Sequence, residues 1–388
     1  MRRWWVAVAA LVLGACGADS PATRESASVT TTAPVTTAAP ATSQPPPAPT
    51  TTTPATTTTA TACAVGRQSP PPAQVAASFP TALAFAPDGR LFSTERAGTI
   101  KVVQDGATRV FGTVSASTSG ERGLLGLAVS PRFATDRSVY TFHSARNGTT
   151  QEVVRWTDCA GDGRNPEVIV QLPAGSTCCH KGGKLAFDPD GKLYVTLGDQ
   201  HAPASAADTS DVRGKLLRYN PDGSIPADNP YGNAVWASGL RNPFGLAISP
   251  AGRIAVTVNG PSGDAGSPST GFDIVYSNVT RGFAGQWPAC YGYSRPLRGA
   301  TCTGNEPDWS SEASAPVPTG AAFVNASGPA RYAGKLVFCT LNAGMKVLTD
   351  GSPHATVADG DPNCRLDVAQ APDNAVYVAD TDAIHRVS

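Results

Sequence analysis

The sequence predicts an all-β domain of the propeller type, and three observations support this. A hairpin pattern, in which an apolar pair precedes a Pro-x-Gly-type turn and a short β-rich run, recurs from about residue 67 onward. The copies are spaced roughly as the four-stranded blades of a propeller are. Charged residues make up only 15% of the 388 residues while Gly and Pro number 39 and 34, which is typical of many tight turns. We therefore expect residues 67–388 to form a six-bladed β-propeller of four-stranded antiparallel blades.

The hairpin pattern is clearest in three copies, which read LAFAPDG, LAFDPDG and LAISPAG and begin at Leu83, Leu185 and Leu246. Weaker copies begin at Leu127 and Val368. The first four starting positions along the chain differ by 44, 58 and 61 residues, slightly more than the roughly 40 to 50 residues of one blade. Insertions in loops would supply the excess. The fifth blade, where the turn signature has faded, should contain the apolar runs GAAFV at 320–324 and KLVF at 335–338.

The amino terminus has the features of an export signal. Two arginines precede a short apolar run that ends at Leu13, and this run is too short to span a bilayer. The run is followed by Gly14, Ala15 and Cys16, which resembles the lipobox of bacterial lipoproteins, where the chain is cut before a cysteine that carries lipid. We expect residues 1–16 to be a lipoprotein signal ending at Cys16 and the protein to be held on the outer face of the cell membrane by its lipid alone. An ordinary cleaved signal with an incidental cysteine is the alternative.

A linker and a neutral surface are expected from composition. Residues 17–66 consist mainly of Thr, Pro, Ala and Ser, which bury too little apolar surface to fold, so we expect a disordered, semi-stiff tether. The chain carries 30 basic and 30 acidic residues, so it has no net charge with which to attract nucleic acid. No nucleic-acid partner is expected.

The chain has nine cysteines. Without Cys16 an even number remains, which in an exported protein indicates disulfides whose pairing the sequence does not reveal. Cys290 with Cys302 is the best local pair, because the Gly- and Pro-containing loop between them could bring its ends together. A zinc site is the competing interpretation, but the adjacent Cys178 and Cys179 lack metal-ligand spacing.

Candidate functional residues should lie at strand ends, where the loops of successive blades meet at one mouth of the central channel. Five segments occupy such positions: GERGLLG from Gly120, HKGGKLAF from His180, LGDQH from Leu197, LRNPFG from Leu240 and NGPSGD from Asn259. A sixth segment, GKLLRYNPDG from Gly214, lies between the third and the fourth. In their order along the chain, the six segments closely resemble the soluble quinoprotein glucose/sorbosone (aldose sugar) dehydrogenases. That family consists of six-bladed propellers that use pyrroloquinoline quinone (PQQ) with calcium.

The resemblance implies three catalytic residues. His180 falls where the family's base removes a proton from the anomeric hydroxyl of the sugar, and a neutral imidazole suits that step. Asp199 matches the acid that orients this histidine. Arg241 matches the cation beside the quinone carbonyls, where charge develops as hydride arrives. The other four histidines are expected to be structural or on the surface.

The resemblance also implies cofactor and metal contacts. Cofactor contacts are expected from Glu121, Arg241, Asn242, Asn259 and Arg365. The backbone carbonyls of Gly260 and Pro261 match positions that bind calcium, which takes oxygen ligands, and Asp264 matches the acidic residue that follows them. The expected partners are a small sugar, which would be oxidised to its lactone, and an external electron acceptor.

Several positions depart from the family pattern. PQQ carries three carboxylates that need cations or strong donors. Asn342, Cys364 and Leu366 stand where the family has a lysine and two arginines, and Phe244 replaces a glutamine. Lys181, Lys184, Arg213 and Lys346 could substitute. Two other functions therefore stay open: a cofactor-less cell-surface binding propeller, as in hedgehog-interacting proteins, and a calcium-dependent lactonase.

Overall fold

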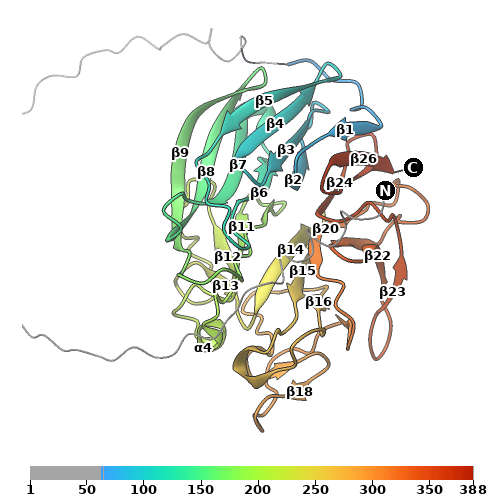
Figure 1. Cartoon of the computed structure of the whole chain (residues 1–388). Helices are drawn as coiled ribbons and strands as arrows, with labels where there is room; N and C mark the ends of the chain where they lie inside the picture. Colours follow the sequence, from blue (N-terminus) through green and yellow to red (C-terminus); the bar gives the residue numbers. More distant parts are fainter. Residues whose placement is uncertain (1–62, 64, 388) are drawn as a thin grey trace, which may run out of the picture. The chain divides into compact units, whose positions relative to one another are not determined.

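Six four-stranded antiparallel sheets follow one another around a ring (Figure 1). The computed structural model describes Cys63 and residues 65–387, and the statements below refer to these residues. The expected signal at residues 1–16, the lipidated Cys16 and nearly all of the tether at 17–66 lie outside them. The six-bladed propeller predicted from the hairpin repeats is confirmed.

The blades are numbered here in chain order. Blade 1 contains β2 (Pro80–Phe85), β3 (Leu91–Glu95), β4 (Thr99–Gln104) and β5 (Ala107–Thr113). Blade 2 contains β6 (Leu124–Val129), β7 (Ser138–Ser144), β8 (Thr150–Cys159) and β9 (Asp162–Pro173). Blade 3 contains β10 (Leu185–Phe187), β11 (Leu193–Leu197), β12 (Lys215–Tyr219) and β13 (Val235–Ala237). Blade 4 contains β14 (Asn242–Ile248), β15 (Ile254–Asn259), β16 (Ile274–Tyr276) and β19 (Trp309–Ser310). Blade 5 contains β20 (Pro318–Phe323), β21 (Leu336–Thr340), β22 (Gly344–Thr349) and β23 (Thr356–Asp359). Blade 6 contains β24 (Asp367–Gln370), β25 (Val376–Ala379), β26 (Ala383–Val387) and β1 (Gln74–Ala76).

Each hairpin repeat forms the first two strands of a blade. In blade 3, Leu185 of β10 faces Val195 of β11, and the turn between them is closed by the N–H of Asp188, which donates to the Lys192 carbonyl at 3.0 Å. Gly191 adopts a φ of +78°, a left-handed conformation that favours glycine, which explains the Asp-Gly signature of the turn. The faded fifth copy also forms such a hairpin, β20 with β21.

The ring is closed by a strand from the other end of the domain. β1 pairs with β26, with Val75 opposite Ile384, so the first strand completes the last blade. The innermost strands of neighbouring blades contact one another in order, and β24 of blade 6 contacts β2 of blade 1. Apolar side chains fill the spaces between blades, as where the ring of Tyr140 of blade 2 packs edge-on against that of Phe187 of blade 3. This closure fixes the positions of the loops at each strand end.

Lys184 and Asp367 form a buried ion pair that connects blades 3 and 6 through the centre of the ring. Their charged atoms lie 3.0 Å apart, and the Lys184 ammonium also donates to the Thr81 carbonyl of blade 1 at 2.5 Å. The N–H of Leu83 donates to the second oxygen of Asp367 at 2.7 Å. Burial raises the pKa of Asp367, so this carboxylate depends on its partners to remain charged.

Three disulfides close loops in the described residues. They join Cys63 to Cys159, Cys290 to Cys302, and Cys339 to Cys364, across sequence separations of 96, 12 and 25 residues. The predicted Cys290–Cys302 pair is confirmed.

The other regular elements among the described residues are α3 (Phe133–Asp136), α4 (Pro203–Ala207), the 3-10 turn η1 (Asp264–Gly266) and the hairpin of β17 (Cys290–Tyr291) with β18 (Arg295–Pro296). Within the described part of the chain, no helix is both long enough and apolar enough to cross a membrane.

Candidate active site

Blades 3 and 4 bring most of the predicted site residues together. His180 lies shortly before β10, Asp199 follows β11, Arg241 precedes β14, and Asn259 ends β15. The N–H of Asp199 donates to the Arg241 carbonyl at 2.8 Å, which ties the two blades together at this point. A Cβ on Gly198 would lie 2.3 Å from the His180 carbonyl oxygen, so only glycine lets the end of β11 approach His180 so closely.

His180 and Asp199 form a buried pair. The Nδ1 atom of His180 lies 2.5 Å from Oδ1 of Asp199, and the two side chains are 3% and 0% exposed. The second oxygen of Asp199 accepts a hydrogen bond from Nε1 of Trp287 at 2.8 Å, and Oδ1 also accepts the N–H of His201 at 3.0 Å. Because a carboxylate only accepts, the neutral imidazole has its proton on Nδ1 and a lone pair on Nε2. The pair therefore has the arrangement of a general base held by an acid.

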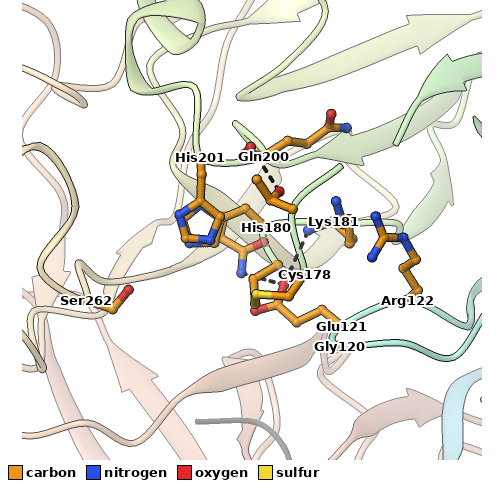
Figure 2. Close-up of a disulfide and its surroundings, with 12 residues drawn as sticks. Gly120, Glu121, Arg122, Cys178, His180, Lys181, Gln200, His201 and Ser262 are labelled. Atoms are coloured by element: carbon orange, nitrogen blue, oxygen red, sulfur yellow. Dashed lines mark hydrogen bonds between the residues drawn. A yellow bond between two sulfur atoms is a disulfide. The ribbon is translucent and has the colours of Figure 1, made fainter. Parts of the chain in front are cut away.

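His201 lies against His180. The two imidazoles are stacked with centroids 4.0 Å apart and planes 21° apart (Figure 2). Both residues have left-handed backbones, with φ of +56° for His180 and +60° for His201, which is uncommon outside glycine and concentrates at functional sites. Burial, and then the neighbouring His180 and Arg241, lower the pKa of His201, which favours its neutral form. His201 therefore lies at the candidate site, and its assignment as a structural or surface residue stays a prediction.

Arg241 and Asp264 form a two-pronged ion pair. Nε and Nη2 of Arg241 each donate to one oxygen of Asp264 at 2.8 Å, and Nη2 also donates to the Ser262 hydroxyl at 2.7 Å. Burial alone would raise the pKa of Asp264, but the hydrogen bonds and charge of Arg241 outweigh it and lower the pKa to about 2. Nη1 of Arg241 donates to the carbonyls of Asn259 and Gly260.

In the structure, a residue predicted to contact the quinone binds residues predicted to contact the metal. Arg241 binds the Gly260 carbonyl and Asp264, two of the three positions expected to bind calcium. A ligand atom from each of His180, His201 and Asp264 lies within 4.8 Å of the others. The predicted residues thus lie together in the structure, but the direct pairing of Arg241 with Asp264 was not predicted.

Glu121 connects blade 2 to this site. Its carboxylate accepts the side-chain N–H of Asn242 at 3.1 Å and the backbone N–H of Lys181 at 3.3 Å. Asn242 and Asn259 face each other across β14 and β15. The Oδ1 atoms of both asparagines and Nε2 of His201 are buried without a hydrogen-bond partner in the described structure. Buried polar atoms are normally paired, so these three atoms are available to a polar ligand or to water.

The predicted contact Arg365 and the positions of blades 5 and 6 that depart from the family pattern are all engaged within the chain or buried in its core. Arg365 is half-buried and donates to the Leu341 carbonyl at 2.7 Å. Cys364 is bonded to Cys339, and Leu366 lies in the apolar core, so neither can serve as a polar contact. Asn342 is exposed and donates to the Ala315 carbonyl at 3.0 Å.

The four cations considered as substitutes all have partners within the chain. Lys184 pairs with Asp367, Arg213 with Asp211, and Lys346 with Asp359. The ammonium of Lys181 donates to the Ala174 carbonyl, and burial lowers its pKa to about 8.

Two residues that contact the site, Trp287 and Asp273, were not predicted from the sequence. Trp287 lies 88 positions from Asp199, and Asp273 accepts the N–H groups of Gly260 at 2.7 Å and Val317 at 2.8 Å. Burial raises the pKa of Asp273. Neither residue belongs to a motif that could have been assigned from spacing, since both act across loops.

The adjacent Cys178 and Cys179, immediately before His180, form a fourth disulfide. The zinc interpretation of this pair is not needed, because its sulfurs bind each other.

Comparison with known proteins agrees with this architecture. A family model described as glucose/sorbosone dehydrogenase matches residues 77–386. The aldose sugar dehydrogenase YliI of Escherichia coli is 28% identical over 77% of this chain and 86% of its own. Quinoprotein glucose dehydrogenase B of Acinetobacter calcoaceticus is 32% identical over 55% of this chain and 51% of its own.

A solved structure shows the same fold. The soluble aldose sugar dehydrogenase of Escherichia coli, in its apo-form, superposes with a TM-score of 0.69 at 26% identity, covering 81% of this chain and 99% of that one. Since the family model spans most of the propeller, the chain belongs to the glucose/sorbosone dehydrogenase family.

Proposed function

We propose that this protein oxidises an aldose sugar to its lactone with PQQ as the cofactor, and that the electrons pass to an external acceptor. The observation that carries the proposal is the buried His180–Asp199 pair beside Arg241. The names of two relatives support it, since one is an aldose sugar dehydrogenase and the other a quinoprotein glucose dehydrogenase.

The site residues fit a polar cofactor in part. The guanidinium of Arg241 suits an anionic group, whereas the unpaired Oδ1 atoms of Asn242 and Asn259 accept hydrogen bonds and suit a donor group of the cofactor. Arg241, Asn242, Asn259 and Glu121 would hold PQQ here, and Arg365 remains a proposed further contact. When bound, PQQ supplies a quinone that accepts hydride.

His180 is the proposed base. Its Nδ1 is committed to Asp199, so Nε2 takes the proton of the anomeric hydroxyl while the hydride leaves the same carbon, and the carbonyl of the lactone forms. Asp199 stabilises the resulting imidazolium because its negative charge lies 2.5 Å away. Arg241 places a positive charge beside the site, which favours charge that develops on a quinone oxygen.

Calcium is a separate part of the proposal, with Gly260, Pro261 and Asp264 as the proposed ligands. Their oxygens are the ligands that calcium prefers. The Gly260 carbonyl and Asp264 already bind Arg241, so this arrangement does not fit calcium unless the guanidinium moves. The roles given to His180, Asp199 and Arg241 above do not depend on the metal.

Export and lipid attachment at Cys16 are proposed from the sequence alone. Such an anchor would present the propeller outside the cell, where sugars and an electron acceptor are accessible.

The test is reconstitution of the purified full chain. PQQ with and without calcium is added, and quinone absorbance and sugar-dependent dye reduction are measured over a panel of aldoses. We expect PQQ to bind in the micromolar range or tighter and dye reduction to be lost in His180→Ala. Absence of binding at micromolar PQQ would exclude the proposal and favour the cofactor-less binding propeller. Lactone hydrolysis without quinone would instead support the lactonase.

A further inference from the structure

The Cys178–Cys179 disulfide closes no loop. The other three bridges join residues 12 to 96 positions apart, whereas these two cysteines are adjacent. A disulfide stabilises a fold mainly by closing a long loop in the unfolded chain, so this bridge has little effect of that kind. Its effect must be local, on the peptide between the two cysteines, which the bridge encloses in a small covalent ring.

The disulfide is fixed to the loop that carries Glu121. The N–H of Glu121 donates to the Cys178 carbonyl at 2.9 Å. A Cβ on Gly120 would lie 2.3 Å from that same carbonyl oxygen, so the two backbones are in close contact. The carboxylate of Glu121 accepts the N–H of Lys181, so one residue holds the chain both before and after His180 (Figure 2).

His180 follows the disulfide directly and has the left-handed φ of +56°. A non-glycine residue keeps such a backbone only where its surroundings determine it strongly. The sulfur atoms also lie within 4.8 Å of a ring nitrogen of His201, which stacks on His180. The disulfide therefore restricts His180 through the backbone on one side and borders its stacking partner on the other.

We propose that the Cys178–Cys179 disulfide is a positioning element for His180, which holds the imidazole in register with Asp199 and makes the site dependent on the oxidised state of this bridge. In the reduced form the covalent ring opens and the two residues before His180 regain backbone freedom. His180 then samples orientations in which the Nδ1 contact to Asp199 is lost. The activity part of this inference rests on the proposed function, whereas the structural part does not.

The first test uses nuclear magnetic resonance on the full chain without cofactor. A proton shared between His180 Nδ1 and Asp199 gives a far-downfield signal, which is assigned as the resonance that is absent from His180→Gln. We expect the signal to broaden or vanish in Cys178→Ser/Cys179→Ser. The control Cys63→Ser/Cys159→Ser removes a bridge across 96 residues at the end of β8, and it should keep the signal.

Unfolding by denaturant separates positioning from general stability. The control should lose stability because its bridge closes a long loop, whereas Cys178→Ser/Cys179→Ser should unfold at nearly the wild-type midpoint. Retention of the His180 signal in the Cys178→Ser/Cys179→Ser variant would overturn the proposal.

Reduction of the wild-type chain serves as a second approach that needs no variant. Dithiothreitol breaks the Cys178–Cys179 bond, transferring two electrons and two protons from its thiols and leaving as its own disulfide. Alkylation and mass spectrometry identify which thiols have formed. Loss of the His180 signal should coincide with alkylation of Cys178 and Cys179, and a signal that persists after both are alkylated contradicts the proposal.

Activity is the third measurement. If wild-type chain reduces dye with PQQ and sugar, the Cys178→Ser/Cys179→Ser variant should lose at least about tenfold in kcat with a smaller change in KM, because the base is misplaced in every bound complex. Unchanged kcat contradicts the positioning role. If the wild-type chain is inactive, the proposed function fails, but the resonance measurements still decide the role of the disulfide.

Discussion

Nδ1 of His180 lies 2.5 Å from Oδ1 of Asp199, and Asp199 is completely buried. The contact joins residues 19 positions apart, on either side of the first hairpin of blade 3. Asp199 thus fixes both the tautomer and the orientation of the imidazole, and Trp287 and the His201 backbone fix Asp199 in turn. Changes at this chain of contacts should affect the reaction more than they affect the fold.

Asp199→Asn should lower kcat by a factor of about 10² to 10⁴, because an amide can donate to Nδ1 and so favour the wrong tautomer of His180. Steady-state dye reduction as a function of pH measures the effect. Asp380→Asn is the matched control, since Asp380 pairs with His385 at 2.8 Å on blade 6 and its hydrogen bonds in the described structure involve none of the proposed site residues. A kcat for Asp199→Asn within twofold of the control would contradict the assigned role.

Trp287→Phe should lower both stability and kcat. The substitution keeps an aromatic ring but removes the pyrrole part of the indole with the N–H that donates to the buried carboxylate of Asp199. A hydrogen bond to a charged group contributes about 1.5–3 kcal/mol. The decrease in kcat should be smaller than for Asp199→Asn, since His180 keeps its own bond. Urea unfolding and dye reduction measure the two effects.

Trp236→Phe is the control for that substitution. The Nε1 atom of Trp236 is buried without a hydrogen-bond partner in the described structure. Trp236→Phe therefore loses ring contacts, such as the one with Arg218 4.7 Å from the ring centroid, but no hydrogen bond, and it should cost less stability than Trp287→Phe. Equal stability losses in the two variants would show that the bond to Asp199 is unimportant.

The sequence predicted the local parts of this structure well. The hairpin repeats located the inner strands because turn chemistry and apolar pairs are encoded within a dozen neighbouring residues, as at Leu185 and Leu246. The pairing of Val75 with Ile384 could not be predicted, since nothing in either strand specifies a partner about 300 residues away.

At the candidate site, too, residues within local motifs were predicted, whereas residues that depend on contacts between distant parts of the chain were not. His180, Asp199 and Arg241 stand in motifs that predicted them, and the structure places them together. Trp287 and Asp273 act from loops with no recognisable pattern and were missed. The position of His201 against His180 also depends on a stacking contact that sequence spacing does not reveal.

The Arg241–Asp264 pair should make stability depend on pH in acid. The folded pKa of Asp264, about 2, lies below the usual 3.8, so the pair stabilises the fold above about pH 4 and the contribution is lost as the pH falls toward 2. A shift of this size corresponds to roughly 2 kcal/mol. Thermal unfolding of wild type and Asp264→Asn should therefore differ most at pH 5 to 7, and the difference should shrink steadily as the pH falls from about 4 toward 2. A difference that widens on acidification would contradict the assignment.

Lys184→Met should be the most destabilising of these substitutions, because it leaves Asp367 buried without its cation. Breaking a buried pair in this way costs about 3–5 kcal/mol. The same change at Lys346, whose partner Asp359 is 81% exposed, should cost no more than about 1 kcal/mol, which makes Lys346→Met the control.

A second substitution and the pH dependence identify the cause of that loss. Lys184→Met/Asp367→Asn removes the unpaired charge and should recover at least half of the lost stability, as measured by urea unfolding. Burial already raises the pKa of Asp367, and loss of Lys184 raises it further. An acid whose folded pKa is raised takes up a proton more readily in the folded state, so the defect of Lys184→Met should shrink as the pH falls. A defect that is independent of pH and unaffected by Asp367→Asn would instead assign the loss to packing of the Lys184 side chain or to its bond with the Thr81 carbonyl.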